Sequence, residues 1–129
     1  MSVEVYKTKW LVRFARRERL SDESLWAAIQ RAEQGLIDAD LGGGLIKQRV
    51  ARAGQGRSGG YRMLVAYRAE GRAVFLYGFA KSERENIGPD ELASLREIAE
   101  AWLGANPEQI ERAVAAKELQ EVSHGKEGN

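Results

Sequence analysis

The chain has 129 residues, of which 43% are hydrophobic and 30% are charged, and its formal net charge at pH 7 is +1. This composition is typical of one globular domain and excludes a disordered or fibrous protein. The absence of cysteine excludes disulfides and thiolate ligands, and the single histidine, His124, leaves almost no material for a metal centre or a histidine-based triad. We therefore expect neither a metal nor a cofactor.

No apolar run approaches the roughly 20 residues of a membrane-spanning helix. The first ten residues, MSVEVYKTKW, lack the apolar centre of a signal peptide. Together with the lack of cysteine, these observations favour a cytoplasmic protein without a membrane partner.

The first 44 residues predict a strand and then a helical hairpin. Residues Val3–Lys7 alternate as a strand does, and Thr8 can cap the helix that follows. Ser21, followed by two acidic residues, begins a second helix that ends near Gly35. Glycines 42–44 predict a flexible hinge. The apolar stripe expected in the first helix consists of Trp10, Leu11, Phe14 and Ala15.

The opposite side of the first helix is basic. We interpret it as a solvated helix face, with nucleic-acid binding as the alternative, because helical surfaces are routinely charged. Its residues are Arg13, Arg16, Arg17 and Arg19.

Three strand-like segments follow, Leu45–Arg52, Tyr61–Arg68 and Arg72–Lys81. The turn at residues 69–71 predicts an antiparallel hairpin between the last two. The loop at residues 53–60 contains the pattern G-x-G-x-x-G, but a strand follows it instead of a helix. A dinucleotide site is therefore rejected, because that site needs the amides of a helix N-terminus.

Positive charge is concentrated in these strands. Residues 45–84 contain nine basic and two acidic residues, whereas residues 85–129 contain four basic and ten acidic ones. A separation of this kind indicates a surface for an anion such as nucleic acid.

The C-terminal part predicts two helices. Gly88-Pro89 begins a helix that ends at Gly104 and covers the sheet, and Asn106-Pro107 begins another. We expect an α+β fold in the order β-α-α-β-β-β-α plus a further C-terminal helix. The predicted division is a compact domain over residues 1–104, the additional helix over 105–122 and a disordered tail over 123–129.

Alternation along the strands predicts which side chains share a face of the sheet. Lys47 and Arg49 lie together, as do Arg62 and Arg68 on the next strand. On the last strand, Phe75, Tyr77, Phe79 and Lys81 are expected to share one face. A register that brings Lys47, Arg49 and Arg62 together, with Lys81 and Arg84 at the end of the last strand, yields a cationic cluster.

Such a cluster suits RNA cleavage by attack of a ribose 2′-hydroxyl on its own phosphate, which needs a proton acceptor, a proton donor and positive charge around the transition state. Arginines disfavour the charged form of a lysine among them, so Lys47 is the candidate base. The arginines would hold the phosphate. The alternative is the ordinary solvated face of a half-covered sheet.

The segments LGGGLIKQRVARAGQGRSGGYRMLVAYR and AVFLYGFAKSERENI, followed by an amphipathic helix, resemble the RelE/HigB superfamily of bacterial type II toxins, and most closely its HigB-like branch. The resemblance covers roughly residues 3–103 and includes the order of the elements. It implies a small toxin, an mRNA interferase, that cleaves messenger RNA on the ribosome and inhibits translation. It also implies a cognate antitoxin, which in the HigB-like branch is commonly a helix-turn-helix protein.

The resemblance assigns the catalytic positions of the family to residues of this chain, namely Lys47, Arg49, Arg62, Lys81 and Arg84. Further RNA contacts are expected from Arg52, Arg57 and Arg68. Two positions depart from the family pattern: Ser82 replaces a frequent arginine, and Asn86-Ile87-Gly88 stand where some members have a tyrosine. Lys81 or Arg84 would then have to be the general acid.

Two other functions are compatible with the same fold. ParE-like toxins resemble this architecture but inhibit DNA gyrase, and a noncatalytic RNA-binding or antitoxin-binding module would explain the departures. The basic residues at positions 47, 49 and 62 favour the nuclease.

Overall fold

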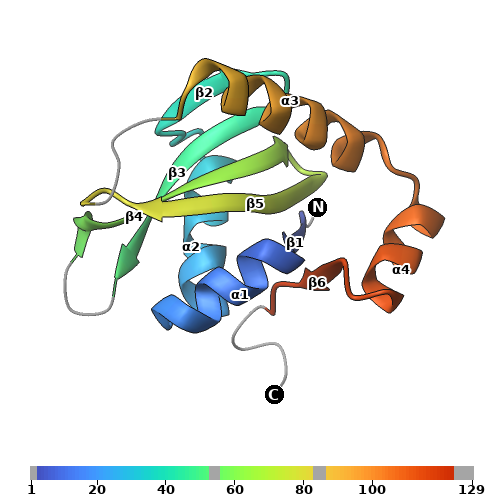
Figure 1. Cartoon of the computed structure of the whole chain (residues 1–129), viewed down its shortest axis with the longest axis horizontal. Helices are drawn as coiled ribbons and strands as arrows, with labels where there is room; N and C mark the ends of the chain where they lie inside the picture. Colours follow the sequence, from blue (N-terminus) through green and yellow to red (C-terminus); the bar gives the residue numbers. More distant parts are fainter. Residues whose placement is uncertain (1–2, 53–55, 83–86, 124–129) are drawn as a thin grey trace.

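The structure, a computed structural model, describes residues 3–52, 56–82 and 87–123, with the backbone alone for residues 52 and 56–59. Within these ranges it has six strands and four helices (Figure 1). In chain order they are β1 (Glu4–Thr8), α1 (Lys9–Glu18), α2 (Asp22–Glu33), β2 (Ala39–Gly42), β3 (Leu45–Arg52), β4 (Gly56–Arg68), β5 (Arg72–Ala80), α3 (Pro89–Gly104), α4 (Pro107–Ala115) and β6 (Leu119–Glu121).

The strands form one sheet in the order β2-β3-β4-β5-β1-β6. The pair β1 and β5 is parallel and the other neighbouring pairs are antiparallel. The predicted α+β, RelE-like order is confirmed, and two short strands, β2 and β6, are added at the two edges of the sheet.

The sheet separates two layers of helices (Figure 1). Helices α1 and α2 pack on one face, over a first core that includes Phe14, Ile29 and Phe75. Helices α3 and α4 pack on the other, over a second core that includes Leu64, Ala99 and Ile110. Because the sheet is covered on both faces, its middle strands carry apolar side chains on both of their faces.

The starts of the first two helices follow from local hydrogen bonds. Thr8 Oγ1 accepts from the backbone N–H of Leu11 at 3.3 Å, and Ser21 Oγ accepts from that of Ser24 at 3.1 Å. Both predicted caps are therefore confirmed. The prediction that Trp10 is buried is wrong, since Trp10 is 40% exposed. It lies at the edge of the apolar stripe and stacks on Phe14 with ring centroids 5.2 Å apart.

Glycines 42–44 form a tight turn and not the predicted hinge. Residues 39–42 pair with β3 as β2, and Gly42, Gly43 and Gly44 have φ values of 88°, 64° and 84°. These left-handed conformations favour glycine, so the run of three glycines specifies a turn.

The alternation predicted for β5 is wrong at its centre. Leu64 lies opposite Tyr77 but Val65 lies opposite Phe75, so Leu76 is an extra residue in β5. This β-bulge changes which face the following side chains occupy. Phe75 therefore packs in the first core and Phe79 in the second.

The helix predicted over residues 105–122 is shorter than predicted. Helix α4 ends at Ala115, and Lys117, with φ at 64°, reverses the chain while the N–H of Glu118 donates to Ala113 O at 2.8 Å. The chain then returns to the sheet as β6 beside β1. Of the predicted tail, Ser123 donates its backbone N–H to Asp22 Oδ2 at 2.8 Å, and residues 124–129 lie outside the described part.

Candidate functional site

A row of basic side chains crosses β3 and β4 on the face that carries α3. Arg49 lies directly opposite Arg62, and Arg62 lies directly opposite Phe79 on β5. Lys47 is two residues before Arg49 on the same face, opposite Leu64. The structure thus brings Lys47, Arg49 and Arg62 together in the register that the alternation permitted. We call these three residues the basic row.

The basic row lies at the end of the second core. Leu45, Leu64 and Ala66 are fully buried under α3, whereas further along the strands Lys47 is half-buried and Arg49 is exposed. Lys47 and Arg49 are therefore accessible from the side of α3, whereas Arg62 is buried.

Arg62 is buried without compensation. It is 9% exposed, and its Nη1 atom has no hydrogen-bond partner within the described residues. None of the basic row forms an ion pair with a carboxylate of the described residues. An unpartnered buried donor costs about 1–3 kcal/mol, so Nη1 of Arg62 is a costly group in the fold of the described residues.

The other two buried cations described in the chain are both paired. Lys7 Nζ lies 2.5 Å from Asp22 Oδ1. Arg72 contacts Glu4 Oε1 at 3.2 Å and donates to the carbonyls of Trp102 and Ala105, each at 2.8 Å. Among the buried cations of the described residues, Arg62 therefore differs in having a guanidinium nitrogen without a hydrogen-bond partner.

Arg49 and Arg62 also repel each other, because like charges directly opposite one another destabilise an antiparallel pair. An anion between the two guanidinium groups would turn this repulsion into two charge-assisted interactions.

The backbone beneath the basic row is held by α2 and the loop after it. The N–H of Arg49 donates to Asp38 Oδ2 at 2.7 Å, and its carbonyl accepts from Arg31 Nη2 at 2.6 Å. Asp38 also lies 3.5 Å from Arg31. The acidic group near Arg49 is thus occupied by the backbone and by another arginine.

Gln48 is a positioning residue that no sequence pattern singled out. It is fully buried, its Nε2 donates to Ala28 O at 2.9 Å, and its Oε1 accepts from the N–H of Asp38 at 2.7 Å. These bonds fix β3 on α2, and since successive side chains alternate, they direct Lys47 and Arg49 to the opposite face.

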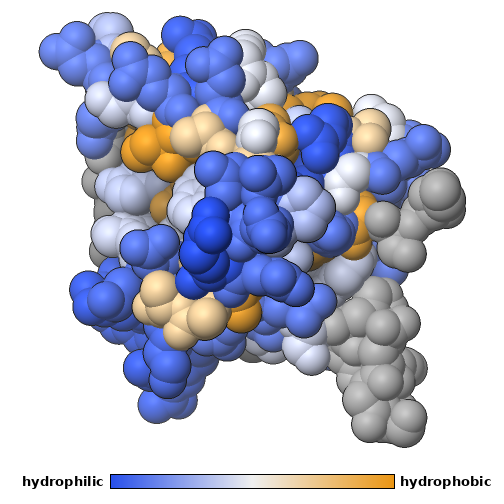
Figure 2. All heavy atoms as spheres, turned by 90° about the vertical axis from the view of Figure 1, so that its right-hand side faces the viewer, coloured by the Kyte–Doolittle hydropathy of each residue, from blue (hydrophilic) through white to orange (hydrophobic). Residues whose placement is uncertain are grey.

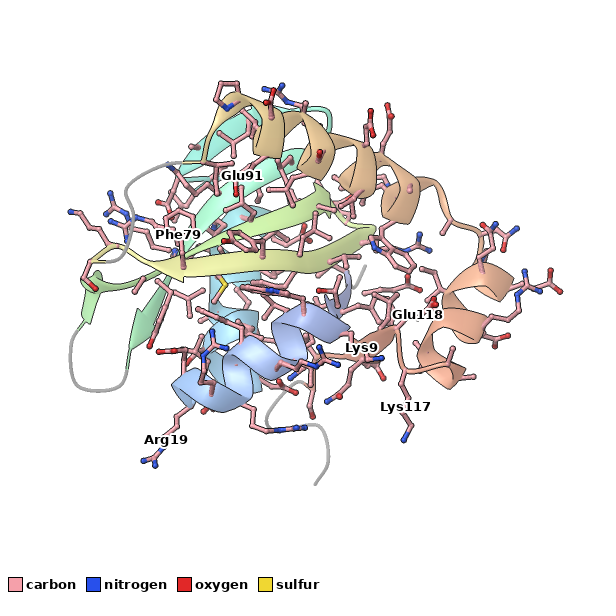
Figure 3. All side chains as sticks on the ribbon, viewed as in Figure 1. Lys9, Arg19, Phe79, Glu91, Lys117 and Glu118 are labelled. Atoms are coloured by element: carbon pink, nitrogen blue, oxygen red, sulfur yellow. The ribbon has the colours of Figure 1, made fainter. Side chains whose placement is uncertain are left out.

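Phe79 forms the end of the second core beside Arg62. It is buried, as its place on a strand predicted, and Figure 3 shows it on the same side of the sheet as Glu91 of α3. Tyr77 is half-buried, with its ring centroid 4.5 Å from that of Trp10 and 6.2 Å from that of Phe79. A pocket of about 220 Å³ lies between Tyr77 and α3.

The remaining predicted site residues are distributed differently. Lys81 is exposed immediately after β5, two residues beyond Phe79. Arg68 is not brought to the basic row, because it lies at the other end of β4 and donates to Leu103 O at 2.7 Å. The side chains of Arg52 and Arg57, and the whole of Arg84, lie outside the described residues.

Tyr67 is not available as a proton donor to the basic row. It packs against the first core, on the face opposite Arg62, and its hydroxyl donates to Glu33 Oε2. Burial, then the hydrogen bond to Glu33, raises the pKa of Tyr67 well above its usual value, so it keeps its proton. Its role is to join β4 to the end of α2.

Neither a metal centre nor a membrane span is found in the described ranges. No group of three or more His, Cys, Asp or Glu side chains gathers there in a way that could hold a metal ion. No helix among these residues is long and apolar enough to cross a membrane.

Comparison with protein families decides the assignment. The family described as "RelE toxin of RelE / RelB toxin-antitoxin system" matches residues 3–122. The chain belongs to the RelE toxin family. No protein of curated function matches the chain.

As a RelE-family member, the protein is the toxin of a toxin-antitoxin system, and an antitoxin is its partner. The match begins at the residue before β1 and extends to the residue after β6, so it includes α4 and the returning strand. The superfamily predicted from the two segments is thereby confirmed.

Proposed function

We propose that this RelE-family toxin is an mRNA endoribonuclease that acts on ribosome-bound messages and so inhibits translation. The observation that carries the proposal is the buried Arg62, which lies opposite Arg49 on one side and Phe79 on the other. Its Nη1 has no hydrogen-bond partner in the part of the chain that the structure describes. An RNA phosphate satisfies this donor, and a base next to that phosphate can contact the aromatic side chains.

The reaction needs no cofactor. The ribose 2′-oxygen attacks the neighbouring phosphorus while the bond from phosphorus to the 5′-oxygen breaks, which leaves a cyclic 2′,3′-phosphate and a 5′-hydroxyl. One proton leaves the 2′-hydroxyl and one is delivered to the 5′-oxygen. Arg62 and Arg49 bind the nonbridging oxygens, whose negative charge increases in the transition state.

Lys47 is the proposed proton acceptor. It is half-buried on the same strand face as Arg49, so its amine reaches the phosphate that the arginines bind. Lys81 is the proposed proton donor on the other side, because it follows the end of β5, two residues beyond Phe79. Arg84 is proposed as a further catalytic residue, and Arg52 and Arg57 as RNA contacts in the β3–β4 loop. Arg68 is left out of this site because of its bond to Leu103.

We further assign the chain to the HigB-like branch, on the two segments that carry the resemblance. The proposed partners are then a helix-turn-helix antitoxin, the ribosome and messenger RNA, and the proposed location is the cytoplasm. The proposed core unit is residues 1–104, extended by the chain up to residue 122.

The test is induced expression of the toxin in bacteria, with transcript 5′ ends mapped before and after induction. Wild-type protein should produce new cleavages within translated frames. Lys47→Ala/Arg62→Ala should remove these cleavages and the growth arrest, because it removes the proton acceptor and the phosphate ligand.

The matched control is Arg17→Ala/Arg19→Ala, which also removes two cations but from α1, on the opposite face of the sheet. It should cleave like wild type. Growth arrest with intact transcripts and a DNA-damage response would instead support a gyrase inhibitor. Equal cleavage by wild type and by the Lys47→Ala/Arg62→Ala variant would reject the proposed site.

A further inference from the structure

A second basic surface lies at the far edge of the sheet from the basic row. A groove of about 470 Å³ runs between α1, β6 and the turn after α4. We call it the α1–β6 groove. Its cations are Lys9, Arg13, Arg16 and Lys117, and its apolar residues are Val12, Val114 and Leu119.

The α1–β6 groove is held in place by the contacts of the C-terminal segment. Trp26 Nε1 donates to Val122 O at 2.8 Å, and the N–H of Val122 donates to Val5 O at 2.8 Å. The N–H of Lys9 donates to Glu118 O at 3.1 Å. Figure 3 shows Lys9 and Lys117 beside this segment, from α1 and from the turn after α4. The groove is therefore preformed.

One wall of the groove is β6, whose outer edge pairs with no strand of the described residues. Val122 and Glu118 bond to β1, and Gln120 lies opposite Lys7, so Gln120 belongs to the same hydrogen-bonded set. In an antiparallel pair the intervening residues direct their N–H and C=O groups away from the partner. Leu119 and Glu121 therefore present backbone donors and acceptors outward, where an extended segment can pair with them.

The composition of the groove favours a peptide over a nucleic acid. Four cations face one carboxylate, that of Glu121, which indicates an acidic ligand. Val114 is 38% exposed and Val12 is half-buried, so these two residues offer a floor to apolar side chains, which a phosphate backbone lacks. Figure 2, viewed from the side of α4, shows apolar patches among hydrophilic residues on this face.

We propose that the α1–β6 groove binds an extended, acidic segment of the cognate antitoxin, which pairs with the free edge of β6 and places apolar side chains on Val12 and Val114. The partner follows from the family of the chain, so the proposal does not depend on RNA cleavage. Because β5 and β1 lie between β4 and β6, this surface is separate from the basic row.

The test measures the affinity of purified toxin for two probes, the full-length cognate antitoxin and a 12-nucleotide single-stranded RNA. Arg13→Glu/Arg16→Glu should raise the Kd for the antitoxin at least tenfold and leave growth arrest intact. Val114→Asp, which keeps all four cations, should also weaken antitoxin binding, because it places a charge on the apolar floor.

The control is Arg17→Glu/Arg19→Glu, which makes the same change of charge on α1 outside the groove and should change the Kd less than twofold. Unchanged antitoxin affinity in both groove variants would overturn the proposal. So would weakened RNA binding with normal antitoxin binding, which would make the groove a nucleic-acid surface. A wild-type dimer that the groove variants convert to a monomer, with antitoxin affinity unchanged, would show that a second copy occupies it.

Discussion

Single buried cations in this protein differ in their partners. A cation with partners stabilises the fold, whereas a cation without them lowers stability and is a candidate for binding a ligand. Arg72 has a carboxylate and two backbone carbonyls, whereas Nη1 of Arg62 has no partner among the described residues. A buried polar group without a partner lowers the free energy of unfolding. Binding sites often carry such a cost because the ligand supplies the missing interaction.

We therefore expect Arg62→Met to raise the free energy of unfolding by about 1–3 kcal/mol while abolishing cleavage, because it removes an unpartnered charge and keeps the apolar stem. Urea denaturation measures the first effect. Arg72→Met is the matched control and should destabilise, because it leaves Glu4 and the two carbonyls without their donor. A loss of stability in Arg62→Met equal to that in Arg72→Met would contradict this account.

The positions of the basic side chains on β3 and β4 could be predicted because alternation is a property of each strand alone. Which residues of β3 and β4 lie opposite each other could be determined only from the paired strands of the structure. The burial of Arg62 was beyond sequence reasoning, since it depends on the residues that β3, β5 and α3 place around it. Arg68 shows the same limit: its bond to the end of α3 joins residues 35 positions apart.

At the scale of the elements, helix starts were predictable and strand irregularities were not. A cap acts within one turn, so Thr8 and Ser21 identify it directly. The bulge in β5 depends on how Tyr77 and Phe75 pack against β4 and both helical layers. Strands β2 and β6 have four and three residues, too short for a pattern of their own, and they exist because β3 and β1 offer an edge.

A comparison of three glycines can test what constrains the turn after β2. Gly44 lies in this turn, and Gly35 and Gly104 are comparison positions elsewhere in the chain. Gly44 has φ at +84°, and a Cβ there would lie 2.7 Å from Leu103 Cδ1. Gly35 has φ at +85° with nothing within 4 Å, and Gly104 has neither constraint. The three positions separate backbone conformation from steric contact.

We expect Gly35→Ala to cost about 1 kcal/mol, the usual cost of a left-handed residue with a side chain. Gly44→Ala should cost roughly 0.5–1.5 kcal/mol more, because the end of the Leu103 side chain must move. Gly104→Ala should be neutral or slightly stabilising. Thermal and urea denaturation of the three variants gives the order, and equal effects at positions 35 and 44 would mean that Leu103 does not constrain the turn.

At the scale of the whole molecule, the C-terminal segment contributes to both cores. Ile110, Ala113 and Leu119 pack in the second core and Val122 packs in the first. The sequence predicted a compact unit that ends at residue 104, because a glycine and a helix cap punctuate the chain there. The contacts of β6 join residues more than a hundred positions apart, which no local pattern indicates.

Truncation after Glu118 should therefore destabilise the protein strongly. Loss of the buried side chains of Leu119 and Val122 costs about 1.5–3 kcal/mol each, and loss of the Trp26 hydrogen bond adds about 1 kcal/mol. That sum is a large part of the stability of an ordinary domain. Circular dichroism and urea denaturation measure it.

Truncation after Ser123 is the control, since it keeps every contact described above. It should match the full chain. If the protein cut after Glu118 unfolds at the same urea concentration as the full chain, then β6 and Val122 add nothing to the stability of the fold.

The position of β1 between β5 and β6 also determines when the fold can be completed. Strand β1 pairs with β5, which begins after residue 71, and with β6, which begins after residue 118. The first strand to be synthesised therefore gains its second neighbour only after the other strands and the helices have been synthesised. Pairing between distant segments is slow and follows local structure. The residues of the basic row are therefore synthesised well before the sheet can be completed. During this interval an antitoxin can bind a toxin that has not yet finished folding.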